Sequence, residues 1–390
     1  MSRPASRAAA PIAVSGCGVV SPIGSDLAAF DTALFAGRSA VRAPSGVPLD
    51  RGSAMALAAA DAAAADARLT SGSFDHERLG IFWGSGMAGA ATFEATCRTV
   101  YADRRRIRPT TVVTTMPNAP VAELALRFGA RGAALTYACA CASSAVAIGE
   151  AMRAIRAGWI DVAIVGGSES MLTPGVLSSW QAMRVLAPVR SDAADATARA
   201  CRPFAADRAG FALGEAAAAF VLESVAHAQA RGADARALLS GYATHCDGVH
   251  ITNPDAAGQA RAMRAALADA GLSAADVGYV NAHGTATLPG DAAEAESIAA
   301  VFGARGVPVS STKAIHGHLL GAGGAVELLA TLRALIAGRL PPTANTTAPD
   351  PAFALDLVVD SARVAAKLRH AMSSSFAFGG TNAVLIASRA

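Results

Sequence analysis

The pattern that most constrains the fold occurs three times: an apolar strand, a turn of small residues that carries one reactive side chain, and a helix. The three reactive side chains are Cys141, His283 and His318. In α/β folds the loops that follow the strands converge on one crevice. We therefore expect an α/β fold in which a sulfur from the first half of the chain meets two imidazoles from the second half.

The turn that carries Cys141 lies between a stretch of mostly small residues, 136–144, and a run of helix formers, 145–155, with apolar residues at helical spacing. A thiol at the first turn of a helix faces unpaired backbone N–H groups and the positive end of the helix dipole. Both features favour the thiolate, which is the nucleophilic form. Taken alone, Cys139 and Cys141 are better explained as small buried core residues, and the rest of the chain is needed to favour a nucleophile.

A short internal echo indicates a duplication. Residues 12–20 resemble residues 238–244, and each opens a segment in which strands alternate with helices. We predict two similar halves, 1–234 and 235–390. Strands are expected at 12–20, 79–83, 160–167, 211–223, 237–243, 277–280, 307–311 and 383–387, and helices at 26–35, 54–67, 145–155, 226–232, 260–271 and 325–337. Residues 43–53 are predicted to form a loop.

Composition excludes several classes of function. A net charge of +3 over 390 residues is too small to indicate nucleic-acid binding. Because no uncharged apolar run reaches about 18 residues, we expect no membrane-spanning helix. The six cysteines do not form a disulfide framework and favour a reducing, cytoplasmic location. Val14–Cys17 could pass as a lipoprotein processing site, but the apolar segment is short and broken by Pro11, so a core strand is favoured.

Two further motifs are expected to be misleading. Gly84, Gly86 and Gly89 match a dinucleotide-binding fingerprint, but they do not follow the first strand of a clear βαβ unit, and a tight turn is the simpler interpretation. His316 and His318 could form a metal pair, but no second ligand cluster follows at metal spacing, and we expect no metal.

The remaining reactive groups suit acyl transfer and carbanion chemistry. A thiolate can take an acyl group, and imidazole N–H groups can hold a developing enolate oxygen. Neutral imidazoles do this without placing a charge in an apolar crevice. Lys313 could orient the site, with Glu327 as its counter-ion, because a buried lysine needs a partner. Phe378, which precedes two glycines, could present its backbone N–H to a thioester oxygen.

Over residues 10–388 the chain resembles an elongating, type II β-ketoacyl-[acyl-carrier-protein] synthase of the thiolase superfamily. The motifs occur in family order: Ala140-Cys141, 281–285, 311–318 and 376–382. The spacing to Ile148-Gly149 selects Cys141 over Cys139 as the nucleophile. The resemblance implies a five-layered, internally duplicated αβαβα fold, a homodimer or a heterodimer with a chain-length subunit, and no bound cofactor. The substrates would arrive on the phosphopantetheine arm of an acyl-carrier protein.

The resemblance also implies a mechanism. Cys141 would take the acyl group, with the N–H groups of Cys141 and Phe378 as the oxyanion hole. His283 and His318 would assist the loss of CO2 from malonyl-carrier protein and stabilise the enolate, which attacks the Cys141 thioester to give a 3-oxoacyl product. The other implied positions are Thr285 and Thr287 for phosphopantetheine, Phe378 as a gate, Met87, Trp180 and Phe376 in the acyl pocket, and Arg105, Arg106 and Arg184 for carrier-protein docking.

Several positions depart from the family pattern. Residues 42–55 are shorter than usual, Ala205 and Ala209 replace usual aspartates, and residues 214–220 replace usual glycines. These losses favour a polyketide or polyene pathway over housekeeping fatty-acid synthesis. Trp180, where a smaller aromatic residue is usual, predicts a short or flat, unsaturated acyl chain. A catalytically silent chain-length subunit is the main alternative from another class, but it usually lacks the cysteine. A degradative thiolase would need a second cysteine within 373–382.

Overall fold

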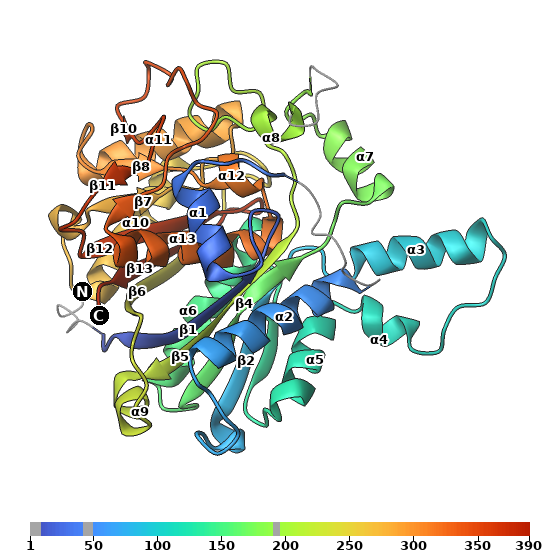
Figure 1. Cartoon of the computed structure of the whole chain (residues 1–390). Helices are drawn as coiled ribbons and strands as arrows, with labels where there is room; N and C mark the ends of the chain where they lie inside the picture. Colours follow the sequence, from blue (N-terminus) through green and yellow to red (C-terminus); the bar gives the residue numbers. More distant parts are fainter. Residues whose placement is uncertain (1–8, 42–49, 190–195) are drawn as a thin grey trace.

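The computed structural model describes residues 9–41, 50–189 and 196–390, and its main feature is an eleven-stranded mixed sheet (Figure 1). The strand order is β10-β8-β7-β12-β13-β6-β1-β5-β4-β2-β3. Two short strands, β9 (Arg339–Leu340) and β11 (Arg363–Val364), pair separately. Most of the expected loop at 43–53 lies outside the described residues.

The sheet consists of two copies of one strand arrangement. In the first half, the order from the centre outward is β1, β5, β4, β2, β3, and in the second half it is β6, β13, β12, β7, β8, with β10 added at the edge. The copies meet where Ile12–Val14 pair antiparallel with Ala237–Leu239. The first-half strands are β1 (Ile12–Val20), β2 (Leu79–Gly84), β3 (Ala134–Tyr137), β4 (Val162–Glu169) and β5 (Ala216–Ser224). The second-half strands are β6 (Ala237–Cys246), β7 (Tyr279–Asn281), β8 (Pro308–Ser310), β10 (Asp356–Leu357), β12 (His370–Phe376) and β13 (Thr381–Ser388).

Helices complete five layers. In the middle, α6 (Ser143–Arg156) packs on α13 (Gly323–Ala337) and on strands of the first half, while α13 also packs on β12 of the second. On the outside, α2 (Arg51–Asp66) and α5 (Ala119–Phe128) cover the first half, and α10 (Ala256–Ala270) and α11 (Leu288–Phe302) cover the second (Figure 1). This arrangement agrees with the predicted duplicated αβαβα fold.

Close backbone approach explains why the outer helices are rich in alanine. A Cβ added at Gly18 of β1 would lie 2.1 Å from the carbonyl oxygen of Ala59 in α2. The second half repeats this contact, because a Cβ at Gly241 of β6 would lie 2.4 Å from the oxygen of Ala266 in α10. Only small residues allow helix and strand to approach this closely. The echo seen in the sequence is therefore a repeated strand–helix contact.

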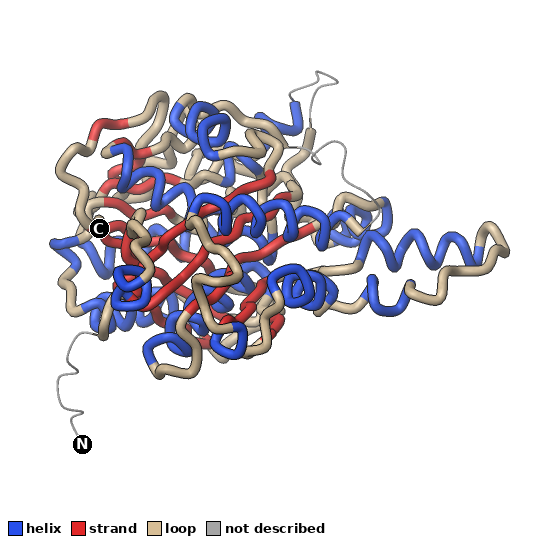
Figure 2. The backbone as a smooth tube through the Cα atoms, turned by 60° about the horizontal axis from the view of Figure 1, so that its bottom comes forward, coloured by secondary structure: helices blue, strands red, loops and turns tan. Residues whose placement is uncertain are grey.

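The other helices are shorter or lie at the periphery. They are α1 (Leu27–Phe35), α3 (Ala90–Tyr101), α4 (Thr111–Thr115), α7 (Pro174–Ala182), α8 (Ala196–Ala200), α9 (Val225–Ala230) and α12 (Lys313–His316), with the 3₁₀ turns η1 (His76–Arg78), η2 (Ala140–Ala142), η3 (Ala274–Asp276) and η4 (Leu320–Ala322). Helices α3 and α4 form an arm that projects from the body of the molecule in both views (Figures 1 and 2). Only one described segment, Leu320–Ala337, is long and apolar enough for a membrane span, and 83% of it is buried inside the protein.

Several predicted boundaries were wrong. The expected strand at 211–223 begins only at Ala216, because Phe211 and Leu213 form isolated bridges with Leu186 and His318. Helix α2 begins at Arg51, so residues 51–53 are helical and not part of a loop. Strand β12 was missed because its three buried serines, Ser373–Ser375, break the apolar pattern of a core strand.

Other predictions agree with the structure. Residues 12–20 form strand β1 with Cys17 buried, as the core-strand interpretation required. The helix predicted to end at Gly271 does end there, with a φ of 67° at that glycine. A Cβ on Gly84 would lie 2.2 Å from the Ser144 nitrogen, so this glycine lets α6 approach β2. The division at residue 234 stays a prediction; it lies between β5 and β6, where one copy of the strand arrangement ends and the next begins.

Candidate active site

Cys141 lies on a sharp turn between β3 and α6. Ala140, just before it, has a φ of +46°, a conformation that L-residues rarely adopt. The Ser143 hydroxyl holds the turn, because it accepts from the Cys139 nitrogen at 2.9 Å and donates to the Ala140 oxygen at 2.6 Å. The side chain of Ser144 accepts from the Ala325 nitrogen at 2.9 Å and so ties the turn to α13. These contacts fix a cysteine that is only 6% exposed.

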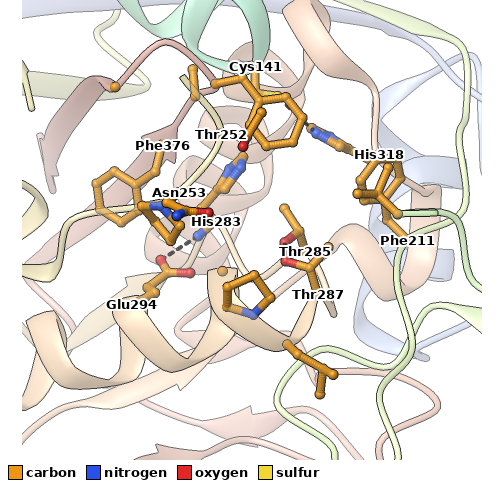
Figure 3. Close-up of a pocket in the computed structure, with 18 of the residues that line it drawn as sticks. Cys141, Phe211, Thr252, Asn253, His283, Thr285, Thr287, Glu294, His318 and Phe376 are labelled. Atoms are coloured by element: carbon orange, nitrogen blue, oxygen red, sulfur yellow. Dashed lines mark hydrogen bonds between the residues drawn. The ribbon is translucent and has the colours of Figure 1, made fainter. Parts of the chain in front are cut away.

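The two candidate catalytic histidines, His283 and His318, come from the second half of the chain and lie near the Cys141 sulfur (Figure 3). His318 Nε2 lies 3.1 Å from Cys141 Sγ. Its backbone is pinned on both sides, since its N–H donates to the Ala212 oxygen at 2.7 Å and its carbonyl accepts from the Gly214 nitrogen at 3.1 Å. The ring of His283 lies 5.5 Å from that of His318, nearly perpendicular at 83°. The structure thus brings the three predicted groups into one site.

A carboxylate that the sequence analysis missed holds the His283 turn. Glu294 on α11 accepts from the His283 nitrogen at 2.7 Å and from the Gly284 nitrogen at 2.6 Å. Burial raises the pKa of Glu294 to about 8, and the two N–H groups act in the opposite direction. No motif marks this residue in the sequence. The signal that could have found it is an acidic side chain on a helix that begins a few residues after a reactive turn.

Lys313 and Glu327 form the buried ion pair that the sequence suggested. The Lys313 side chain is fully buried and bonds directly to a Glu327 carboxylate oxygen. Its Nζ also lies 3.1 Å from His283 Nδ1. Because an ammonium group can only donate, Nδ1 must accept, and the ring proton of neutral His283 is on Nε2.

Burial and the Lys313 charge together keep both imidazoles neutral. They lower the pKa of His283 and of His318 well below the usual 6.5. The expectation of a resting Cys141 thiolate was wrong, because burial raises the pKa of this thiol to about 12. Lys313 and the backbone N–H groups of Phe378 and Cys141 act in the opposite direction but do not compensate for the lost solvation. The cysteine is a thiol at neutral pH.

His316 does not take part in the site. Its Nδ1 lies 2.8 Å from the Gly317 oxygen and its Nε2 lies 3.1 Å from the Thr312 hydroxyl, so the suggested pair with His318 does not form. The sulfur of Cys141 and nitrogens of His283 and His318 do lie within 4.8 Å of one another, a spacing that could hold a metal ion. The Lys313 ammonium beside His283 opposes a second cation there.

A cavity of about 400 Å³ opens beside the three reactive groups (Figure 3). The predicted residues that line it are Cys141, Arg184, His283, Thr285, Thr287, His318, Phe376 and Phe378. The hydroxyls of Thr285 and Thr287 lie 2.9 Å apart on its wall. The cavity therefore joins the sulfur to the two threonines and to the exposed Arg184.

The residues predicted to form the acyl pocket fall into two groups. Met87 and Trp180 pack against the buried cluster that contains Cys141. Trp180 stacks on Phe378 with ring centroids 6.2 Å apart and meets Phe211 edge-on at 5.7 Å. Phe376 does not join them; it packs in another buried cluster, and its ring lies 6.1 Å from that of His283. Phe211, which the sequence analysis missed, belongs to the same cluster as Cys141 and lies 4.9 Å from the His318 ring.

The predicted docking arginines are exposed but not all at one place. Arg184 lies at the cavity, whereas Arg105 and Arg106 lie in the connection between α3 and α4, on the projecting arm.

The structure also explains how the chain tolerates the two missing aspartates. Arg208, between Ala205 and Ala209, is buried, and its Nη1 bonds to Asp350 at 2.7 Å. Its Nε lies 3.8 Å from Asp291, and its guanidinium lies 4.7 Å from the centroid of the Phe353 ring. Carboxylates from other segments therefore balance this charge.

Comparisons with known proteins agree with this geometry. The family models described as Beta-ketoacyl synthase, N-terminal domain, and Beta-ketoacyl synthase, C-terminal domain, match residues 47–228 and 236–347. The chain is 42% identical over 342 residues to Nodulation protein E of Rhizobium meliloti (strain 1021), covering 87% of this chain and 82% of the relative. It is 38% identical over 344 residues to 3-oxoacyl-[acyl-carrier-protein] synthase 2 of Staphylococcus aureus, covering 87% and 84%.

Solved structures extend the similarity over almost the whole fold. One is a type II polyketide acyl-carrier protein in complex with its ketosynthase bound to the hexaketide, with a TM-score of 0.91 and 28% identity, covering 98% of this chain and 100% of that one. Another is the ishigamide ketosynthase/chain length factor, with a TM-score of 0.90 and 29% identity, covering 98% of this chain and 100% of that one.

Proposed function

The chain belongs to the β-ketoacyl synthase family, and we propose that it condenses an acyl group held on Cys141 with malonyl-acyl-carrier protein, releasing CO2 and giving a 3-oxoacyl-acyl-carrier protein. The observation that carries this proposal is the meeting of the Cys141 sulfur with two neutral imidazoles, one of them 3.1 Å away. Ketosynthases use no free cofactor, so the groups that perform the reaction are those of the chain and of its carrier-bound substrates.

The first step is acyl transfer. The Cys141 thiol gives its proton to His318 Nε2 at 3.1 Å as the sulfur attacks the thioester carbonyl. The N–H groups of Cys141 and Phe378, which already point at the sulfur, hold the oxyanion. The carbon–sulfur bond to the carrier arm breaks, and the departing thiolate takes the proton from His318. The products are acyl-Cys141 and a free carrier thiol.

The second step is decarboxylation. The bond between the malonyl carboxylate and the α-carbon breaks, CO2 leaves, and the electron pair forms an enolate. The Nε2–H of His283, fixed in that tautomer by Lys313, donates to the enolate oxygen. His318, whose Nε2 accepted the thiol proton in the first step, donates beside it after its single ring proton moves from Nδ1 to Nε2. Neutral donors suit this task because a charged imidazole would require desolvation in a buried site.

The third step forms the new carbon–carbon bond. The α-carbon of the enolate attacks the acyl-Cys141 carbonyl, the carbon–sulfur bond breaks, and the sulfur leaves. The product stays on the carrier protein and is two carbons longer than the acyl group. The sulfur leaves as a thiolate, takes up one proton from solvent, and returns to the thiol form that burial favours.

The cavity supports binding of a phosphopantetheine arm. Thr285 and Thr287 offer hydroxyls along the cavity wall, and Arg184 offers a positive charge where an acidic carrier protein would dock. Phe378, stacked on Trp180, would gate the acyl side. The solved ketosynthase in complex with its acyl-carrier protein favours the same kind of partner here.

A second chain is proposed to cover β3. This edge strand exposes Leu135, and the Thr136 hydroxyl is buried with no partner in the part of the chain that the structure describes. The neighbouring arm exposes Phe93, Val112 and Val113 at 60%, 64% and 60%. Unpaired edges and apolar patches of this kind normally meet a partner. The solved ketosynthase/chain length factor makes a heterodimer as reasonable as a homodimer.

A specialised pathway is favoured over housekeeping fatty-acid synthesis. The nodulation protein is more identical to this chain than the staphylococcal 3-oxoacyl synthase is, and the replaced aspartates fit a divergent member. A cytoplasmic location is part of this proposal, because carrier-bound synthesis of this type is soluble.

Intact-mass spectrometry tests the proposal. Incubation with acyl-acyl-carrier protein should add the acyl mass to the wild-type chain and to a Cys246→Ala variant, but not to Cys141→Ala. Addition of malonyl-acyl-carrier protein should then discharge the acyl group as 3-oxoacyl-carrier protein. A chain that forms a stable complex with a cysteine-containing ketosynthase but never acylates would instead be a chain-length subunit. The protein is expected to keep full activity when a chelator is added. Loss of activity on chelation, together with metal found in the untreated protein, would favour a metal site.

A further inference from the structure

The two halves of the chain carry matching turns, but only one carries a nucleophile. In the first half, η2 places Cys141 after Ala140, with φ +46°. In the second half, η4 places Gly321 after Leu320, with φ +41°. Each turn leads directly into a central helix, and the two turns contact one another. Gly321 is therefore the counterpart of Cys141 in the duplicated fold.

The backbone N–H of this second turn is occupied by a buried carboxylate, Glu169. Its Oε2 accepts from the Gly321 nitrogen at 3.0 Å and from the Gly86 nitrogen at 2.7 Å. Its Oε1 accepts from the Met87 nitrogen at 3.0 Å and from the Ser85 hydroxyl at 3.1 Å. The residue is 0% exposed at the end of β4. One carboxylate thus satisfies four donors from two distant segments.

These segments carry parts of the active site. Gly321 follows Leu320, which packs in the same buried cluster as Cys141, and comes three residues after His318. Met87 packs against that cluster from the other segment. The segments approach so closely that a Cβ on Gly321 would lie 2.1 Å from the Gly86 nitrogen. A shift of either segment would therefore move the His318 turn relative to Cys141.

We infer that Glu169 is a positioning residue, which holds the turn after His318 against the Ser85–Met87 segment and thereby fixes the sulfur–imidazole distance and the wall of the acyl pocket. The inference rests on the proposed function, because acylation of Cys141 is the activity by which it is tested. His283 is held separately by Glu294 and Lys313, so Glu169 governs the His318 side of the site. An amide in its place would turn an N–H group toward the donors and leave part of the cluster unpaired.

The test compares Glu169→Gln with Glu223→Gln. Glu223 is also 0% exposed at the end of a strand, but its partners are Ser15, His227 and Arg231, away from the cavity. Acyl transfer from acyl-carrier protein to Cys141 is followed by intact mass at pH 8. Glu169→Gln should lower the maximal acylation rate at least tenfold with KM for the carrier within about twofold, because docking surfaces are untouched. Glu223→Gln should keep both constants within about twofold.

Ser85→Ala removes one of the four donors and is the milder variant in case Glu169→Gln does not fold. It should lower the acylation rate by a smaller factor than Glu169→Gln and leave KM unchanged. Equal rate losses in Glu169→Gln and Glu223→Gln that follow their melting temperatures would overturn the inference, as would an unchanged rate in Glu169→Gln. Failure of the wild-type chain to acylate would refute the proposed function instead.

Discussion

Removing the charge of Lys313 should separate the stability of the site from its chemistry. Lys313 is fully buried and bonded to Glu327, and its Nζ is 3.1 Å from His283 Nδ1. A Lys313→Met variant leaves the Glu327 carboxylate without its partner. Breaking a buried pair in this way costs about 3–5 kcal/mol of the free energy of unfolding. Adding Glu327→Gln removes the unpaired charge, so the double variant should recover most of that loss.

The loss of decarboxylation rate caused by Lys313→Met should not be recovered in the double variant. Without the ammonium group, His283 is no longer held with its proton on Nε2, and one enolate donor is lost. Loss of one such donor lowers the rate by about 10²–10³. Decarboxylation of malonyl-carrier protein should fall by this factor in Lys313→Met and in the double variant, whereas acylation of Cys141 should change much less.

Denaturant unfolding and the two half-reactions check these expectations. Arg333→Met is a suitable control, because its pair with Asp31 is partly exposed and lies outside the cavity. It should leave both half-reactions unchanged. The reasoning would be refuted if the double variant were as unstable as Lys313→Met, or if either variant decarboxylated at the wild-type rate.

Four further expectations follow from the geometry. Alkylation of Cys141 by iodoacetamide should rise about tenfold per pH unit from pH 7 to pH 10 without a plateau, because burial raises the pKa of this thiol to about 12; a plateau near pH 8 would contradict it. Arg105→Glu with Arg106→Glu should raise KM for acyl-carrier protein with no change in melting temperature, whereas Arg68→Glu, with its exposed side chain paired to Asp234, should not. Trp180→Ala should extend the accepted acyl chains to longer ones, and wild-type preference for long saturated chains would remove this assignment. Asp350→Asn should lower the melting temperature at pH 7, because Arg208 holds the pKa of Asp350 below its usual 3.8. The difference should begin to shrink as the pH falls below 3.8 and vanish once the pH is below the lowered pKa; Asp207→Asn is the exposed control.

The fold could be predicted further than the details of its elements. The echo between β1 and β6 indicated a duplication, and the contacts of Gly18 and Gly241 show the physical constraint behind it. Strand β12 was missed because three serines interrupt its apolar pattern. The strand is a core strand because it pairs on both sides, with β13 and β7, and a local pattern does not reveal that pairing.

The reactive groups were found because each lies alone among small residues, and the two imidazoles were correctly expected to be neutral. The protonation state of Cys141 was not predicted. A helix start favours a thiolate, and the structure confirms that N–H groups face Cys141. Burial dominates because the loss of hydration exceeds the gain from a few dipoles. How deeply a residue is buried depends on segments far away in sequence, so the sequence could not give the sign of this shift.

The residues that position the reactive groups were missed for a related reason. Glu294 and Glu169 act through backbone N–H groups of other segments, and no spacing in the sequence relates a carboxylate to such donors. Lys313 and Glu327 were found only because a buried charge demands an opposite one.

Duplication explains why the site is chemically asymmetric. Two equivalent turns meet at the centre of the molecule, and each could in principle carry a nucleophile. The turn at Gly321 cannot, because even a Cβ there would lie 2.1 Å from the Gly86 nitrogen, and Glu169 already fills the space in front of its N–H. The turn at Cys141 kept the side chain and the free N–H group. One copy therefore supplies the sulfur, and the other copy supplies the histidines and holds them against it.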